Sequence, residues 1–463
     1  MSNVEAREAD SLYEVRHKVY PRAVSGLFAR WRWAMVWITQ LVFYGVCWLP
    51  WNDRQAVLFH LAERKFYIFG WVFWPQDVFY LSVLLIISAF SLFLFTAVAG
   101  RLWCGYACPQ TVYTEIFLWL ERVIEGDRAQ RMKLDRGPAS AAKFARKSAK
   151  YAAWTLLSLW TGISFVGYFT PIRELLPALA GFEIGGWALF WVLFYSGFTY
   201  LMAGVMREQV CKYMCPYARF QGVMFDPDTL TITYDEARGE PRGPRRKGGA
   251  LQAQGDCVDC GICVQVCPTG IDIRKGLQYE CIGCAACIDA CDQVMDKVGL
   301  PRGLVRYSTE NAVRKHWGQA DILRHLLRPR ILIYSLILGL VCLSFIWALL
   351  TREPLHLDVQ KDRSVVAREV DAEWVENVYV IKLLNMAEED REFRVILEGL
   401  PEARLEGVAP VVRVAAGERL SQPLRVRVPL GALSRGSHKF RFEALVETMP
   451  GQRVGERAVF VVP

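Results

Sequence analysis

Fourteen cysteines carry most of the chemical information in this chain of 463 residues. Eight of them form two runs, and in each run three cysteines are separated by two residues and a fourth follows after three more. Such a run wraps one corner of an iron-sulfur cubane, and its fourth cysteine reaches across to the other cluster. The predicted ligands are Cys257, Cys260, Cys263 and Cys291 for one [4Fe-4S] cluster, and Cys281, Cys284, Cys287 and Cys267 for the second.

Two alternatives for these eight cysteines are less favoured. Structural zinc sites show separated cysteine pairs for each metal, and disulfides are rare in a reducing cytosol. One position departs from the usual motif, because Asp292 stands where a second proline is expected. An acidic neighbour there is expected to lower the reduction potential of the cluster that Cys291 ligates. A pair of such clusters has no open site for chemistry, so this chain is expected to move electrons.

A second set of cysteines repeats the motif CxxxCP. Cys104 and Cys108 precede Pro109, and Cys211 and Cys215 precede Pro216. A four-residue spacing places both sulfurs on one face of a helix, and the proline bends or ends that helix. The similar sequences around the two motifs suggest a duplicated unit that brings four thiolates to one membrane surface.

Four thiolates would favour a soft metal such as Cu(I), zinc or an iron-sulfur cluster. The CxxxC spacing does not match the cubane motif, so a third cluster is less favoured, and two buried or reversibly oxidised thiol pairs remain an alternative. The isolated Cys47 and Cys342 are interpreted as apolar packing.

The elements that position these cysteines include membrane spans. Hydrophobic residues make up 53% of the chain, yet 55 Lys and Arg against 47 Asp and Glu leave a net charge of +8. Apolar and charged residues must therefore be segregated, as in a membrane protein with soluble parts. Five segments approach the roughly 20 apolar residues that a spanning helix needs. They are residues 33–49, 78–99, 151–169, 187–206 and 331–350, whereas 66–74 is too short to span and is placed at the interface.

The distribution of Lys and Arg predicts the orientation. With the N-terminus inside, the cytoplasmic segments carry 6 (1–32), 10 (100–150) and 18 (207–330) of them, against 3 (50–77) and 1 (170–186) outside. This bias is the positive-inside pattern of a multi-pass membrane protein whose N-terminus lies in the cytoplasm. Because it accounts for the basic charge, and no stacking platform accompanies that charge, nucleic-acid binding is not predicted.

The C-terminal part has a different pattern. Short alternating runs at 378–384, 393–397, 411–414, 424–428, 440–446 and 458–462 predict strands, and no helical stretch separates them. This indicates an immunoglobulin-like all-β sandwich outside the membrane.

The predicted domain order follows. It comprises a cytoplasmic segment (1–32), a membrane domain with four spans (33–206), a cytoplasmic linker and two-cluster domain (207–330), span five (331–350) and a periplasmic immunoglobulin-like domain (351–463).

Two segments flank the cluster motifs. Residues 238–255 form a linker rich in Gly, Pro and Arg. Residues 310–327 have helical periodicity and are predicted to lie on the inner membrane surface, with a docking face for an electron donor as the alternative. The six histidines are scattered, and no phosphate loop or flavin-attachment motif is present, so neither a histidine ligand nor a flavin is predicted.

Taken together, these features resemble the cytochrome c oxidase accessory protein family, CcoG, also called FixG or RdxA. The resemblance rests on the spans, the twin CxxxCP motifs, the eight-cysteine insert, the segment Gly299-Leu-Pro-Arg-Gly-Leu-Val-Arg-Tyr307 and the β-rich tail. It implies a cupric reductase that supplies Cu(I) for assembly of cbb3-type oxidases, so the expected partners are that assembly machinery, copper-handling proteins and membrane lipid. It also implies that Cys104, Cys108, Cys211 and Cys215 bind or reduce copper.

Two other functions stay open. One is a quinol-oxidising electron-transfer subunit that resembles NapH-type polyferredoxins, which have no long β tail. The other is a structural chaperone whose clusters sense redox state. The electron donor and the oligomeric state are not predicted from the sequence.

Overall fold

The computed structural model describes residues 18–244, 254–352, 355–362, 367–370, 373–387, 389–447 and 452–463. Part of the predicted cytoplasmic segment (1–17) and of the predicted linker (245–253) lies outside these residues. The chain forms two compact units. The first comprises the described residues of Met1–Leu58 and Tyr80–Cys342, and the second comprises Phe59–Phe79 and the described residues of Leu343–Pro463.

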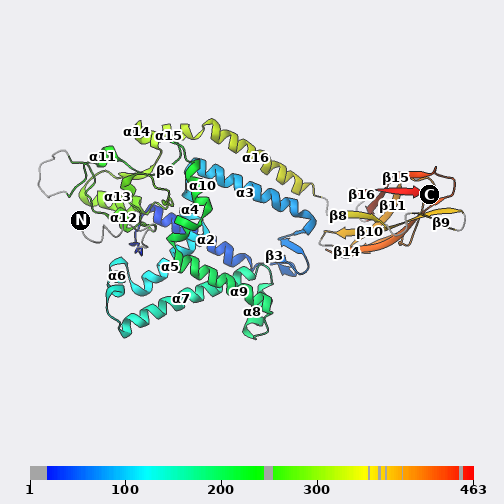
Figure 1. Ribbon diagram of the computed structural model, residues 1–463, viewed down its shortest axis with the longest axis horizontal. Coiled ribbons are helices and arrows are strands. Elements are labelled where there is room, and N and C mark those ends of the chain that lie inside the picture. Colours follow the sequence, from blue (N-terminus) through cyan, green and yellow to red (C-terminus); the bar gives the residue numbers. More distant parts are fainter. Residues whose placement is uncertain are drawn as a thin grey trace, which may run out of the picture. The chain divides into compact units, whose positions relative to one another are not determined.

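The first unit is mainly helical (Figure 1). Its longer helices are α2 (Leu27–Val46), α3 (Val78–Ala99), α5 (Pro109–Glu125), α7 (Ala141–Val166), α9 (Gly186–Thr199) and α16 (Pro329–Leu350), of which α3 and α16 run on into the second unit. Its shorter helices are α4 (Leu102–Tyr106), α6 (Arg128–Arg136), α8 (Ile172–Ala180), α10 (Pro216–Met224) and α11 (Glu236–Gly239). Two π-helical turns, η2 (Tyr200–Met206) and η3 (Val210–Met214), follow α9.

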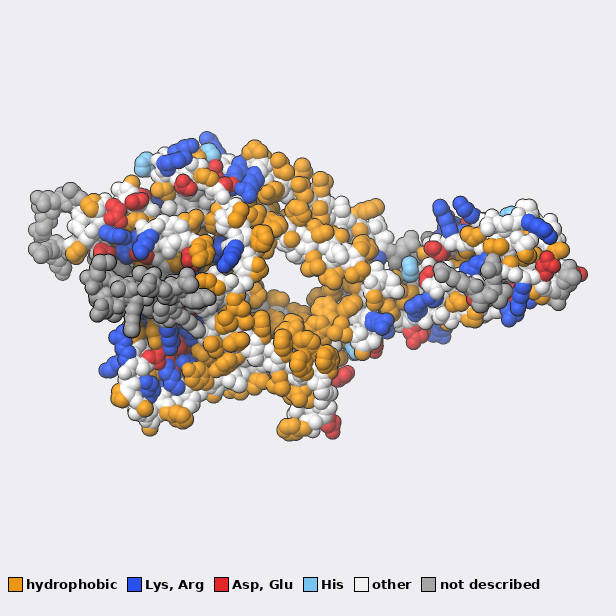
Figure 2. Space-filling view, viewed as in Figure 1, with side chains coloured by type: hydrophobic (Ala, Val, Ile, Leu, Met, Phe, Trp, Pro, Cys, Tyr) orange, Lys and Arg blue, Asp and Glu red, His pale blue; other side chains and the backbone are white. Residues whose placement is uncertain are grey.

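Three helical segments of the described chain, rather than the predicted five, are long and apolar enough to cross a membrane. They are Pro75–Ala99, Gly186–Met206 and Pro329–Leu350. The other two predicted spans form α2 and α7, which end at Val46 and Val166, before the predicted spans do. Any stretch of 18 residues within these helices therefore includes charged residues, Arg30 and Arg32 on α2 and Lys150 on α7. Arg32 on α2 and Ser158, Thr161 and Ser164 on α7 are all buried. Figure 2 shows hydrophobic side chains gathered along α3 and α16.

The predicted interfacial segment 66–74 forms β-structure. Strands β3 (Val57–His60), β4 (Lys65–Ile68) and β5 (Trp71–Phe73) form a three-stranded sheet in that order, and β1 (Pro50–Trp51) and β2 (Arg54–Gln55) form a separate two-stranded sheet. In the second unit Arg352 donates to the carbonyl of Val72 at 2.9 Å and forms an ion pair with Asp77 at 2.6 Å. These bonds attach the segment after α16 to this sheet.

The cysteine-rich region forms a small domain around strands β6 (Thr231–Tyr234) and β7 (Val305–Ser308). It holds α12 (Ile262–Gln265), η4 (Ile273–Lys275) and α13 (Ala286–Val298). Part of the predicted linker is fixed to it, because Arg238 forms an ion pair with Asp256 at 2.6 Å. The predicted helix over 310–327 is instead two helices, α14 (Glu310–Arg314) and α15 (Gln319–Leu326), because His316 adopts a positive φ and Gly318 precedes α15.

Helix α4 packs directly on a turn of this domain through two glycines. A Cβ atom added at Gly105 would lie 2.8 Å from the Cα of Cys284 and from the carbonyl of Gly283. A Cβ atom added at Gly283, whose φ is +69°, would lie 3.0 Å from the carbonyl of Arg101. Backbone therefore meets backbone here, which side chains would prevent. This contact positions the first CxxxCP motif against the second cysteine run.

The second unit contains the predicted β-sandwich, with all six predicted strands present. The first sheet has the strand order β12 (Arg404–Glu406), β14 (Arg419–Pro429), β10 (Trp374–Asn385), β8 (Leu355–Lys361), and β9 (Arg368–Val370) also pairs with β10. The second sheet has the strand order β13 (Val412–Val414), β11 (Arg391–Glu398), β15 (Gly436–Val446), β16 (Arg453–Val462). Alternate residues of both sheets, among them Tyr379, Ile381, Phe393 and Phe442, are fully buried between them. The sandwich is closed by this apolar core.

A buried carboxylate joins three strands of the first sheet. Glu376 lies directly opposite Arg368 on β9 and Arg427 on β14. Its carboxylate accepts hydrogen bonds of 2.7 Å from each arginine. Burial raises the pKa of Glu376, but the two arginines outweigh it and hold that pKa below the usual 4.5. The carboxylate therefore stabilises the sheet above the usual pKa, and this contribution is lost as pH falls through the lowered value.

Glu376→Gln is expected to increase local opening of β10 at neutral pH, by roughly 3 kcal/mol, because two arginines lose their counter-charge. Amide hydrogen exchange of Trp374–Asn385 in the full chain measures this, and the difference from wild type should shrink at pH 4. The control is Glu369→Gln, at an exposed carboxylate on β9. Equal protection in wild type and Glu376→Gln at neutral pH would contradict the prediction.

Gly105→Ala is expected to push α4 away from the turn at Cys284 and to remove the cluster predicted there, lowering bound iron from about eight to about four per chain. Anaerobic iron analysis of the purified protein measures this. Gly222→Ala is the matched control, because it also lies in a short helix and an added Cβ there meets nothing within 4 Å. Full iron content in Gly105→Ala would show that the close contact is dispensable.

Candidate functional site

The two predicted ligand sets lie around two separate cavities. The first cavity is lined by Cys257, Cys260, Cys263 and Cys291, with Tyr234 and Met295 among its walls. The second cavity is lined by Cys267, Cys281, Cys284 and Cys287, and Cys263 also reaches it. The fourth cysteine of each run thus sits with the first three of the other, as the spacing predicts. Tyr234 of β6 and Val305 of β7 line the first cavity, and Ile232 of β6 lines the second.

The two cysteine runs adopt the same backbone conformation. In the first run Asp259 and Gly261 have positive φ angles of 52° and 63°. At the corresponding positions of the second run, Gly283 and Ala285 have φ angles of 69° and 57°. These turns direct backbone N–H groups toward sulfur, since the amides of Gly283 and Ala286 hydrogen-bond the thiols of Cys281 and Cys284. Such bonds tune the potential of an iron-sulfur cluster.

The thiols of both cavities are strongly perturbed. Burial raises the pKa of Cys263 to about 11 and the pKa values of Cys281 and Cys291 to about 12. Neighbouring sulfurs raise them further, because the charged forms repel one another. The interacting sulfurs belong to the same predicted ligand set. The pKa of Cys291 is raised by Cys257, Cys260 and Cys263, and the pKa of Cys281 is raised by Cys267. Donor type and grouping fit two iron-sulfur clusters.

Asp292 lies beside the first cavity. Its carboxylate accepts a hydrogen bond of 2.9 Å from the amide of Gly303 and contributes to the raised pKa of Cys291. The negative charge is therefore close to this sulfur, and the predicted lowering of the cluster potential stays a prediction.

The structure brings the four CxxxCP cysteines, hereafter the thiol tetrad (Cys104, Cys108, Cys211 and Cys215), into one neighbourhood. Each pair spans a break between helices rather than one continuous helix face. Cys104 lies in α4 and Cys211 in η3, whereas Cys108 and Cys215 have extended backbones and precede α5 and α10. The prolines begin the new helices, where a missing N–H costs nothing.

The tetrad is partly buried and electrostatically coupled. Burial, together with the charge of the neighbouring Cys108, raises the pKa of Cys104 to about 11 and the pKa of Cys211 to about 12. Gln110 connects the two motifs, because its amide donates to the carbonyls of Met202 at 2.9 Å and Arg207 at 3.2 Å. Two chain segments about a hundred residues apart thus form one group of thiols.

The tetrad adjoins the second cavity. Cys104 and Cys211 pack against the same apolar cluster as Cys284 and Cys287. Gly105, next to Cys104, makes the close contact with the turn at Cys284 described above. The tetrad and the second cysteine run are therefore neighbours through direct packing.

Three polar residues near the tetrad were not singled out from the sequence. Arg101 is buried, donates to the carbonyl of Ala218 and acts electrostatically on Cys104, Cys211 and Cys281. Fully buried Gln221 accepts a 3.3 Å hydrogen bond from the Cys104 thiol. On the other side of the second cavity, buried Arg32 opposes the rise in the pKa of Cys284 that burial causes. The one sequence signal for any of them is an arginine shortly before each CxxxCP motif.

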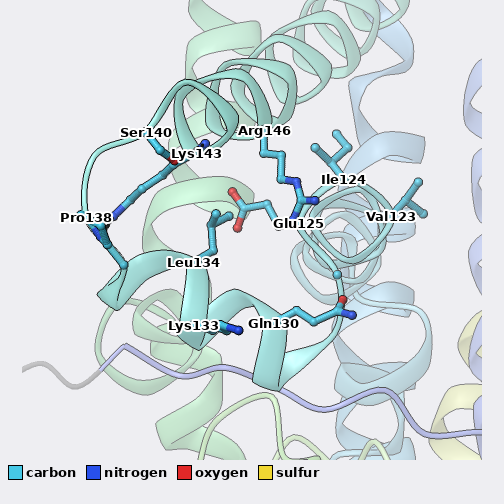
Figure 3. A pocket seen from close by; sticks show the side chains of 12 residues that line it. Val123, Ile124, Glu125, Gln130, Lys133, Leu134, Pro138, Ser140, Lys143 and Arg146 are labelled. Atoms are coloured by element: carbon cyan, nitrogen blue, oxygen red, sulfur yellow. Dashed lines mark hydrogen bonds between the residues drawn. The ribbon is translucent and has the colours of Figure 1, made fainter.

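The second of those arginines anchors the other motif. Arg207 precedes η3 and pairs with buried Glu121 on α5 at 3.0 Å, and Arg131 pairs with the same carboxylate at 3.0 Å. Burial raises the pKa of Glu121, but Arg207, Arg131 and Lys150 together lower it below its usual value. Nearby Glu125 pairs with Lys150 at 3.0 Å and faces a cavity between α5, α6 and α7 (Figure 3). This ion network holds α5 and the Cys211 segment together.

The four thiols of the tetrad lie near one another but are not arranged as the ligands of a metal ion. Within the described residues, no group of three or more His, Cys, Asp or Glu side chains is arranged to hold a metal ion. Cys47 and Cys342 stand apart from both cavities and from the tetrad, and Cys47 is buried. The site thus consists of two cysteine-lined cavities and one adjoining thiol tetrad.

Three family models match this chain. A 4Fe-4S dicluster domain matches residues 206–310, a 4Fe-4S binding domain matches residues 81–125, and the immunoglobulin-like fold at the C-terminus of FixG matches residues 345–463. The first two matches include the CxxxCP motifs as well as both cysteine runs. The chain is therefore an iron-sulfur electron-transfer protein with an immunoglobulin-like C-terminal region.

Known relatives extend over most of the chain. The nitrogen fixation protein FixG of Rhizobium meliloti is 42% identical over 433 residues, covering 86% of this chain and 83% of that protein. Protein RdxB of Cereibacter sphaeroides is 39% identical over 466 residues, covering 98% of each. The ferredoxin-type protein NapH of Haemophilus influenzae is 28% identical over 209 residues, covering 40% of this chain and 66% of that protein. With this identity, coverage and domain order, the chain belongs to the FixG family.

Proposed function

We propose that this chain is a membrane cupric reductase that uses two [4Fe-4S] clusters to reduce Cu(II) to Cu(I) for assembly of a cbb3-type oxidase. The observation that carries the proposal is that Cys104 and Cys211 of the thiol tetrad pack against the same apolar cluster as Cys284 and Cys287, which line the second cavity. Reduction of Cu(II) needs one electron, and thiolates stabilise the Cu(I) product.

The cluster ligands are assigned within this proposal. Cys257, Cys260, Cys263 and Cys291 hold one cluster, and Cys281, Cys284, Cys287 and Cys267 hold the other. When bound, the clusters would supply electrons one at a time. The buried cations Arg32 and Arg101 face this region, and they would offset the negative charge that thiolate-ligated clusters carry.

Cys104, Cys108, Cys211 and Cys215 are the proposed copper-binding and copper-reducing residues. Because burial and mutual repulsion raise the pKa values of the Cys104, Cys108 and Cys211 thiols, these three thiols are protonated at neutral pH. Copper must displace these protons, so copper binding strengthens as pH rises. Arg101 favours the thiolate form at Cys104 and Cys211 and therefore assists this step.

The proposed location is the bacterial inner membrane. In that arrangement the N-terminus, both clusters and the tetrad are cytoplasmic, and the immunoglobulin-like domain is periplasmic. The support is the excess of Lys and Arg in residues 1–32, 100–150 and 207–330 and the apolar helix α16, which follows the cysteine domain. Oxidase assembly factors and copper-handling proteins are the proposed partners.

A quinol-oxidising subunit of a respiratory chain is the second candidate. It is favoured by the likeness to NapH, which covers 40% of this chain. The match of residues 345–463 to the C-terminal FixG domain favours the first candidate, because the NapH likeness leaves most of this chain uncovered.

Replacement by serine of the fourth cysteine of each run, Cys267 or Cys291, tests the cluster assignment. Cys291→Ser is expected to remove the cluster of the first cavity, and Cys267→Ser that of the second, because serine is a poor ligand for iron. Each variant should keep about four irons per chain, and the two should give different electron paramagnetic resonance spectra after dithionite reduction. Cys342→Ser, at an isolated cysteine, is the control. Identical residual spectra in the two variants would contradict the crossed arrangement.

Replacement of the thiol tetrad by serine tests the copper proposal. Dithionite-reduced wild-type protein, freed of excess dithionite under anaerobic conditions, is mixed with Cu(II), and cluster reoxidation and Cu(I) formation are followed. The wild type should form about one Cu(I) per electron lost, whereas the tetrad variant should reoxidise at least tenfold more slowly and lose copper binding. A Cys47→Ser, Cys342→Ser double variant is the control. Equal rates and equal copper binding in tetrad variant and wild type would favour the second candidate.

A further inference from the structure

A cavity of about 570 Å³ lies between α5, α6 and α7 of the first unit (Figure 3). Part of its wall is cationic and is formed by Lys133 of α6 and by Lys143 and Arg146 of α7. Another part is apolar and includes Val123 of α5 and Leu134 of α6. A cavity with both kinds of wall fits a molecule that is anionic at one end and apolar at the other.

Among the described residues, no carboxylate forms an ion pair with any of the three cations of this wall. The ion pairs of α6 and α7 in this region use Asp135, Lys147 and Lys150 instead. Lys143 donates to the backbone carbonyls of Asp135 and Gly137 at 3.0 and 2.7 Å, which uses two of its three N–H donors. Positive charge is therefore left for an anionic ligand to neutralise.

Glu125 also faces the cavity, but its charge is already paired. It is 1% exposed, and its carboxylate forms ion pairs of 3.0 Å with both Lys147 and Lys150. It belongs to a network in which three carboxylates meet five cations, namely Glu121, Glu125 and Asp135 with Lys18, Arg131, Lys147, Lys150 and Arg207. The network as a whole is therefore positive and does not repel an anion from the cavity.

The cavity lies where α7 changes from a charged to an apolar helix. Residues 141–150 carry the cations Lys143, Arg146, Lys147 and Lys150, whereas residues 151–166 include no charged side chain. Phe144 is 76% exposed and Val123 of the cavity wall is 64% exposed. Figure 2 shows Lys and Arg side chains gathered over α6 and the start of α7. Cations beside exposed apolar side chains at the end of a predicted span are typical of the headgroup level of a membrane, where anionic phospholipids bind.

We propose that this cavity binds the phosphate headgroup of an anionic phospholipid, with Lys133, Lys143 and Arg146 around the phosphate and the acyl chains against the apolar wall. Inorganic phosphate offers the same charge but has no apolar part. A zwitterionic phospholipid adds a quaternary ammonium group that these cations repel. The inference is independent of the proposed copper chemistry, because it involves none of the cysteines.

The test uses the full-length protein in detergent and native mass spectrometry, with dioleoyl phosphatidylglycerol and dioleoyl phosphatidylcholine as probes. Wild type should bind one phosphatidylglycerol per chain more tightly than any further lipid, and phosphatidylcholine at least tenfold more weakly. A Lys133→Gln, Arg146→Gln double variant should bind phosphatidylglycerol roughly tenfold to thirtyfold more weakly, because each cation near an anionic headgroup strengthens binding about fivefold. Both side chains are exposed, so their replacement leaves the helix packing intact.

An Arg136→Gln, Lys297→Gln double variant is the matched control, because it removes the same two charges from exposed positions outside the cavity. It should bind phosphatidylglycerol as wild type does, and an excess of inorganic phosphate should leave the wild-type complex intact. Equal affinity of the two double variants, equal affinity of wild type for the two lipids, or displacement of the lipid by inorganic phosphate would overturn the proposal. Copper is absent from this assay, so its result is independent of the test of the thiol tetrad.

Discussion

The close backbone contact between α4 and the turn at Cys284 is the constraint on which the rest of the site depends. Only glycine at positions 105 and 283 allows the carbonyl groups of one segment to approach the Cα atoms of the other this closely. The contact places Cys104 on one side of the interface and Cys284 on the other. A larger separation would leave the tetrad and the second cavity as unrelated features of the fold.

Buried charge is the second constraint on the first unit. Glu121 sits among Arg131, Lys150 and Arg207, so each ion in this network has a partner. The Nε atoms of Arg32, Arg101 and Arg131 have no hydrogen-bond partner within the described residues, but Arg131 pairs with Glu121 through its Nη1 atom. Arg32 and Arg101 act on cysteines assigned to clusters, where negative charge would be introduced by deprotonated thiols. Their unsatisfied state in the protein chain alone is consistent with a site completed by an anionic group.

The second unit is stabilised by different interactions from the first. Its sandwich is held by an apolar core and by the Arg368–Glu376–Arg427 group that joins three strands, and it has no cysteine. The β4–β5 hairpin belongs to the same unit, because Arg352 binds both Val72 and Asp77. The core of this unit is therefore formed by apolar side chains, whereas the cysteine domain has a small core in which the thiols themselves take part.

The sequence determined the parts of this protein that depend on local spacing. Cysteine intervals predicted the grouping of the eight cysteines around two cavities, and period-two alternation predicted six strands of the sandwich, because both signals are set within a few neighbouring residues. Hydropathy was less decisive, since α2 and α7 carry polar side chains whose burial the sequence does not reveal. The helices do end at the CxxxC thiols, as the prolines predict, but the shared helix face expected for each pair is absent because Cys108 and Cys215 are extended. The single helix expected at 310–327 was wrong, because the turn at His316 interrupts it.

Tertiary structure alone decided what lies next to what. Arg32 and Gln221 were not predicted, because each lies far in the sequence from the cysteine it affects. Arg101 directly precedes the first CxxxCP motif, but its effect on Cys211 and Cys281 arises only from packing. Packing joins such residues through contacts between distant segments, and a single sequence records the residue types but not those contacts.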